Sequence, residues 1–194
     1  MEQPREIGRF ALYGEVDAPT APEFVHMEPI SERSSLHEWT ISPHAHPGIV
    51  QLLLLEAGEG LLASEGAETP LVPPALVALP SGSVHAFRFS PAAEGWVLSL
   101  AVQMLSDARL AAFSPALSAA GAPPRSLRVS GKEAARLSWL LADLAGVLAG
   151  DRAGRLADRA AAQIGLIMAL AGEVLGGAPA APRHASRRAE LAAA

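Results

Sequence analysis

Three histidines have the spacing of a metal-binding or ligand-binding site. His44 and His46 are separated by one residue at the start of an apolar segment, and His85 ends the segment Pro80–His85 after a second apolar run. Alternate side chains of a β-strand point to the same face, so both imidazoles of the first pair should point one way, where a third can join them. Imidazole is the commonest metal ligand, and this trio predicts a site for a divalent metal such as zinc. Without a metal, the same imidazoles can hydrogen-bond an organic ligand directly.

The first part of the chain has the pattern of a β structure. Residues 1–102 contain short apolar runs that are separated by Gly, Pro and Ser. Strands of this length and spacing predict an antiparallel sandwich or barrel. The expected strands are Glu23–Pro29, Leu36–Ser42, Ile49–Glu56, Gly60–Ser64, Thr69–Val72, Ala75–Leu79, His85–Ser90 and Gly95–Val102.

The second part of the chain, residues 103–176, is rich in Ala and Leu and predicts helices. The expected helices are Ser106–Ala120, which Pro115 should kink or split, Ser130–Ala149 and Arg152–Leu175. Ser130 and Glu133 have the spacing of a capping box, and a short turn makes the last two helices an antiparallel hairpin. Apolar residues such as Trp139 and Met168 extend beyond one helical stripe, which predicts a second buried face and a homodimer interface.

Composition limits the classes of function. The chain has 194 residues and a net charge of −5, which argues against nucleic-acid binding by this segment alone. It contains no cysteine, so disulfides and thiolate metal ligands are excluded. The N-terminus lacks a signal-peptide pattern, and no apolar run reaches the ~18 residues of a membrane span. We therefore expect a cytoplasmic protein without a membrane partner.

The segments around the histidines resemble the two motifs of the cupin superfamily. Gln51 stands where the first motif has a carboxylate, and Gly58 matches the glycine of that motif. Pro80, Gly82 and His85 match the second motif. The resemblance implies a cupin-like antiparallel β-barrel, or jelly roll. With the helical hairpin after it, the expected fold class is α+β with the β part first.

A narrower resemblance comes from four further segments. Phe24–Ser34, Leu36–Trp39, Val84–Ser90 and Gly95–Leu98 are similar to the sensory domains of AraC-type transcription regulators, in the group that responds to 4-hydroxybenzoate and 4-hydroxyphenylacetate. This resemblance implies an effector-binding domain over residues 1–103 and a dimerising hairpin over residues 104–176. Residues 177–194 would then be a linker toward a helix-turn-helix DNA-binding domain that is absent from this chain.

The expected ligand-binding residues are the motif histidines, the glutamine that replaces the motif carboxylate, and aromatic side chains that can stack on an aromatic ligand. They are His44, His46, Gln51, His85, Phe87, Trp39 and Trp96, of which the three histidines are the candidate metal ligands. On its strand Gln51 shares parity with Leu53 and Leu55, whereas Arg88 has the parity opposite to His85 and should face outward.

Three functions fit the pattern. The first is a sensor, without enzymatic activity, that binds a small aromatic acid and controls the absent DNA-binding domain. The second is a metal-dependent cupin enzyme, a dioxygenase or isomerase. Against it are Gln51 in place of the carboxylate and Phe89 in place of a later asparagine of the cupin motif. The third is a dimerisation module whose pocket has lost its function.

Overall fold

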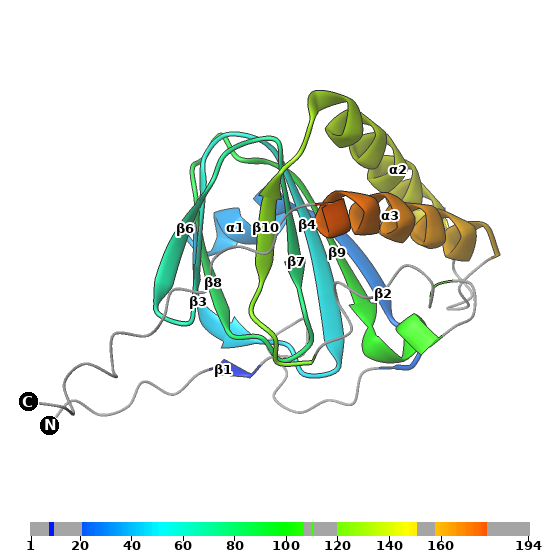
Figure 1. Ribbon diagram of the computed structural model, residues 1–194, viewed down its shortest axis with the longest axis horizontal. Coiled ribbons are helices and arrows are strands. Elements are labelled where there is room, and N and C mark those ends of the chain that lie inside the picture. The colour runs from blue at the N-terminus through cyan, green and yellow to red at the C-terminus, as the bar shows by residue number, and fades with distance from the viewer. Residues whose placement is uncertain (1–7, 10–20, 107–109, 111–119, 151–157, 178–194) are drawn as a thin grey trace, which may run out of the picture.

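Two five-stranded sheets lie face to face, and two long helices cover the outer face of one of them (Figure 1). The computed structural model describes residues 8–9, 21–106, 110, 120–150 and 158–177. The first sheet has the order β1-β3-β8-β5-β6, with the strands Gly8–Arg9, Thr40–Ala45, His85–Phe89, Gly60–Ser64 and Ala67–Leu71. The second sheet has the order β10-β7-β4-β9-β2, with the strands Arg125–Arg128, Ala75–Leu79, Ile49–Ala57, Glu94–Ala101 and Val25–Pro29.

The helices are α1 (Ile30–Leu36), the short 3₁₀ helix η1 (Val102–Ser106), α2 (Gly131–Gly150) and α3 (Asp158–Gly177). Apart from the parallel pair of β1 with β3, the described strand pairs are antiparallel. This arrangement confirms the predicted fold class, a cupin-like β sandwich followed by a helical hairpin.

Strand β4 is buried on both faces, which explains its continuous apolar sequence. Leu52 and Leu54 belong to the core that the second sheet shares with α2 and α3. Leu53 and Leu55 belong to a second core, between the two sheets. Gln51 has the parity of the inner pair, so it faces the space between the sheets, as predicted.

The predicted hairpin is confirmed by α2 and α3, which pack against each other and against the second sheet. At the start of α2 the Glu133 amide donates to Ser130 Oγ (3.3 Å) and the Ser130 amide donates to Glu133 Oε2 (3.0 Å), so the capping box is formed. The Arg159 guanidinium of α3 pairs with the Asp143 carboxylate of α2 at 2.9 Å. By length and composition α3 could cross a membrane, but 44% of its apolar window is buried in the molecule, where it serves as a core helix.

Several described elements differ from the sequence prediction, which contained no strand at β1 and no helix at α1 or η1. The expected strand Leu36–Ser42 is wrong at its start, because Leu36 ends helix α1 and β3 begins at Thr40. Left-handed backbone at Glu38 and Trp39 (φ of 51° and 61°) makes the sharp connection, which has no periodic sequence signal.

Strand β10 was not predicted either. Its four residues contain one apolar side chain, Leu127, too few for an alternation signal, and pairing with the edge of β7 makes it a strand. β10 comes from the segment 104–176 yet joins the second sheet, so the division at residue 103 remains a proposal. The predicted helix Ser106–Ala120 lies almost entirely outside the described residues, and the predicted linker 177–194 lies outside them from residue 178 on.

Candidate functional site

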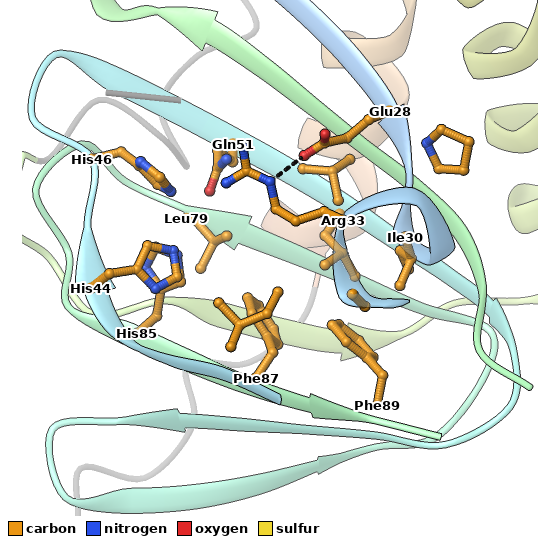
Figure 2. A pocket seen from close by; sticks show the side chains of 15 residues that line it. Glu28, Ile30, Arg33, His44, His46, Gln51, Leu79, His85, Phe87 and Phe89 are labelled. Atoms are coloured by element: carbon orange, nitrogen blue, oxygen red, sulfur yellow. Dashed lines mark ion pairs between the residues drawn. The ribbon is translucent and has the colours of Figure 1, made fainter. Parts of the chain in front are cut away.

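Three buried imidazoles meet at one end of the space between the sheets (Figure 2). His44, near the end of β3, is in register with His85, the first residue of β8, and His46 follows directly after β3. The ring centroids are separated by 4.4 Å for His44 and His85, 4.7 Å for His44 and His46, and 5.6 Å for His46 and His85. One nitrogen from each ring lies within 4.8 Å of the others. The predicted convergence of the three histidines is therefore confirmed.

Backbone carbonyls fix the tautomer of two of these rings. The carbonyl oxygen of Ser42 lies 2.8 Å from Nδ1 of His44, and that of Ser83 lies 3.0 Å from Nδ1 of His85. A carbonyl can only accept, so each Nδ1 carries the proton and each Nε2 keeps its lone pair. These two imidazoles therefore offer acceptor or metal-ligand nitrogens.

Burial keeps both rings neutral. It lowers the pKa of His44 below its ordinary value, and the positive charge of Arg33 lowers it further, against the opposing hydrogen bond to Ser42. The pKa of His85 falls from 6.5 to about 3, first because burial disfavours the charged form and then because His44 lies beside it. At neutral pH both rings are uncharged.

A polar amide and an apolar wall complete the inner part of the cavity. Gln51 Nε2 donates to Ser99 Oγ at 3.0 Å, and both side chains are buried. Phe87 and Phe89 are stacked with centroids 5.2 Å apart, and the Phe87 ring also meets the edge of His85 at 5.7 Å. The remaining apolar lining residues are Pro29, Ile30, Ile41, Leu53, Leu79 and Val97.

Charged residues from β2 and α1 form the other wall, and the sequence did not single them out. Arg33 Nε lies 3.2 Å from Glu28 Oε1, and His26 Nε2 lies 3.2 Å from Glu28 Oε2. Glu28 is 8% exposed, and both Glu28 and Arg33 line the cavity. Alternation on β2 could have placed His26 and Glu28 on one face, but the inward direction of Arg33 depends on α1, which was not predicted.

Two predicted ligand-binding residues lie elsewhere. Trp96 pairs with Leu54 and lies on the face of β9 that packs toward the helices, because its parity is opposite to that of the lining residue Val97. Trp39 is partly buried against the core between the sheets but does not line the cavity. His44, His46, Gln51, His85 and Phe87 do come together around it. Arg88 faces outward, as expected, and pairs with exposed Glu68 at 3.3 Å.

The cavity is small. The centre of a water-sized sphere can occupy about 40 Å³ of it. One water needs roughly 10–15 Å³ by this measure, whereas pockets for drug-sized ligands measure about 300–1,000 Å³. The space in the structure suits a metal ion or a few waters, and an aromatic ring would require the cavity to widen.

The donor set fits a divalent metal. His44, His46 and His85 would hold it, and the carbonyls at Nδ1 of His44 and His85 are the partners that orient metal-bound imidazoles. The present nitrogen separations, up to 4.8 Å, would have to shorten to about 3.3 Å for tetrahedral zinc. A metal would supply a Lewis acid that polarises a ligand oxygen.

Comparison with known proteins places the chain in a family. The model of the AraC-like ligand binding domain matches residues 25–168, well over half of the chain. The chain belongs to this family. The match covers the sheets from β2 onward, the cavity and most of the hairpin of this AraC-like domain.

Similar solved structures include an AraC-like transcriptional activator, ToxT and a predicted oxalate decarboxylase. The AraC-like transcriptional activator CuxR has 13% sequence identity and a TM-score of 0.42, and the match covers 71% of this chain and 46% of CuxR. ToxT from Vibrio cholerae has 6% identity and a TM-score of 0.40, with 60% of this chain and 47% of ToxT covered. A predicted oxalate decarboxylase from Thermotoga maritima has 16% identity and a TM-score of 0.30, with 40% of this chain and 80% of that protein covered. The AraC-like domain thus spans less than half the length of CuxR or of ToxT. No curated protein sequence matched it.

Proposed function

We propose that this AraC-like domain is the effector-sensing and dimerisation part of a cytoplasmic transcription regulator. Its effector would be a small aromatic carboxylic acid of the hydroxybenzoate type, bound between the two sheets. Binding would control a helix-turn-helix DNA-binding domain that lies outside this chain. The division into a binding part (1–103), a dimerising part (104–176) and a linker (177–194) belongs to this proposal.

The observation that carries the proposal is the polarity of the cavity. Acceptor nitrogens of His44 and His85 lie at one end, the stacked rings of Phe87 and Phe89 form a wall, and the Arg33 side chain extends from α1 into the same space (Figure 2). An aromatic ring that carries a hydroxyl and a carboxylate offers a hydrogen-bond donor for the imidazoles, an apolar face for the phenylalanine rings and an anion for the guanidinium. The proposed ligand contacts are therefore these residues with His46 and Gln51.

A thermal-shift and calorimetric panel of hydroxylated benzoates and phenylacetates tests the proposal, with and without a chelator. A ligand that binds only the folded state raises the melting temperature, by mass action. Saturable binding of at least one acid, without conversion of the acid, is the expected result. If no acid of the panel binds, the sensor function is wrong and the module with a non-functional pocket is favoured.

The histidine cluster favours one alternative, a metal-dependent cupin enzyme. Elemental analysis of the purified protein and chromatography of the acids after incubation distinguish the two functions. Product that forms only with metal would establish the enzyme, and stoichiometric binding without product supports the sensor.

The proposed dimer interface is the exposed side of the hairpin. Trp139 of α2 and Leu166 of α3 are 67% and 49% exposed, and they border an apolar groove with a volume of about 590 Å³. Exposed apolar surface of this kind is typical of interaction sites. A second copy of the hairpin would cover it, and an effector that changes the relative energies of two hairpin arrangements by ~1–3 kcal/mol would suffice for regulation.

A further inference from the structure

The ion pair between Arg33 and Glu28 forms part of the cavity wall. Its side chains are 26% and 11% exposed, and the two atoms are 3.2 Å apart. Among the residues that line the cavity in the described part of the chain, Arg33 is the single lysine or arginine. Figure 2 shows its side chain extending from α1 into the space that Gln51 and the histidines border. An acid that enters this space therefore meets one cation, and that cation already holds a carboxylate.

We infer that Arg33 recognises the carboxylate of the effector, and that Glu28 is an internal carboxylate which the effector displaces from it. This inference rests on the proposed function and adds the residue that selects an acid over a neutral analogue. A guanidinium matches a carboxylate with two parallel hydrogen bonds. His44 and His85 cannot serve the carboxylate in the same way, because their Nδ1 protons go to backbone carbonyls and their Nε2 atoms accept. The acid group is therefore bound at Arg33, and the hydroxyl is bound at the histidines.

Charge balance favours displacement over sharing. Glu28 and Arg33 together are neutral, and a second carboxylate beside them would leave one uncompensated negative charge in a largely buried site, which is costly. Glu28 has a second contact, since His26 Nε2 lies 3.2 Å from its Oε2 atom. It can therefore turn from Arg33 and keep a hydrogen-bonding partner at the partly exposed edge strand β2.

Displacement would act on the elements that hold the hairpin. The ion pair ties α1 to β2, and α1 also lies against β9. The opposite face of β2 carries Val25 and Met27, which pack against the core shared with α2 and α3. Release of Glu28 changes the restraint on β2, so binding of the effector's carboxylate would affect the packing of β2 against the hairpin.

Two neutral substitutions test the exchange. Arg33→Gln removes the cation, and Glu28→Gln removes the competing carboxylate with almost no change of shape. Arg88→Gln is the matched control, because Arg88 forms a similar ion pair with Glu68 on the outer surface. Calorimetry with 4-hydroxybenzoate and its neutral amide, in the presence of a chelator, gives the acid-to-amide affinity ratio for each variant.

The expected results differ in direction between the two variants. Arg33→Gln lowers the acid-to-amide ratio by about 10- to 100-fold, as loss of a charge-assisted hydrogen bond does. Glu28→Gln raises the affinity for the acid by about 10-fold or more and leaves that for the amide nearly unchanged. Arg88→Gln behaves as the wild type.

Each other outcome decides against one of the claims. If the wild type binds the acid but both cavity variants keep its acid-to-amide ratio, the inference is wrong and the sensor function stands. If the wild type binds neither this acid nor any other of the panel, both are wrong. If Arg33→Gln does not fold, Glu28→Gln and Arg33→Lys decide. A higher affinity of Glu28→Gln for the acid and an acid-to-amide ratio above one in Arg33→Lys support the inference. The absence of both effects overturns it.

Discussion

The pH dependence of stability should report the burial of His85. Because burial lowers the pKa of this imidazole from 6.5 to about 3, the folded protein does not take up the proton that the unfolded chain binds below pH 6.5. Above that pH both states are neutral at this position and the stability is complete. As the pH falls from 6.5 toward 3, the unfolded state binds more protons and the free energy of unfolding decreases.

The magnitude follows from the shift. Within this window one histidine changes the free energy of unfolding by about 1.4 kcal/mol per pH unit. Between pH 6.5 and pH 5 the loss attributable to His85 is therefore about 2 kcal/mol, before most carboxylates begin to titrate. The lowered pKa of His44 acts in the same direction.

Urea denaturation of His85→Gln and the wild type, with a chelator present, measures this difference. The variant should lose about 2 kcal/mol less than the wild type between pH 6.5 and pH 5, whatever its stability at neutral pH. Leu36→Gln is the control, because Leu36 is exposed and carries no titratable group, so the slope should not change. Equal slopes for wild type and His85→Gln would refute the assignment of a buried, neutral imidazole.

Three further predictions concern metal, assembly and packing. One divalent zinc ion per chain should bind with a rise in melting temperature, and His44→Ala should abolish the rise; zinc protection that survives this substitution would exclude the histidine site. Trp139→Glu should convert a dimer into a monomer in light scattering, whereas Leu36→Glu, at a residue that is 79% exposed outside the hairpin, should not; a dimer in both variants would place the interface elsewhere. Gly95→Ala should destabilise the protein by more than about 3 kcal/mol in denaturation, because its Cβ would lie 1.9 Å from the Leu54 carbonyl oxygen. Gly146→Ala, with open space around it on α2, should stabilise the protein by up to about 1 kcal/mol. Similar effects of the two substitutions would contradict the close approach of β9 and β4.

Local patterns in the sequence were enough to place the histidines. The spacing of His44 and His46, and the position of His85 after a second apolar run, specify strands whose ends can meet. Strand parity was also sufficient for Gln51 and Arg88, because a period of two holds along any regular strand. The capping box at Ser130 marked the start of α2 for the same local reason.

Tertiary structure alone decided the rest of the site. Both faces of the second sheet are buried, one by the first sheet and one by the helices, so parity could not tell which face of β9 borders the cavity and Trp96 was placed on the wrong one. The seven residues of α1 carry no strong periodic signal, and their helix is fixed by packing of Ile30 in the core between the sheets. The inward direction of Arg33 and its contact with Glu28 follow from that packing. Sequence periodicity records which side chains share a face, whereas the identity of the partner across that face is set only when distant elements come together.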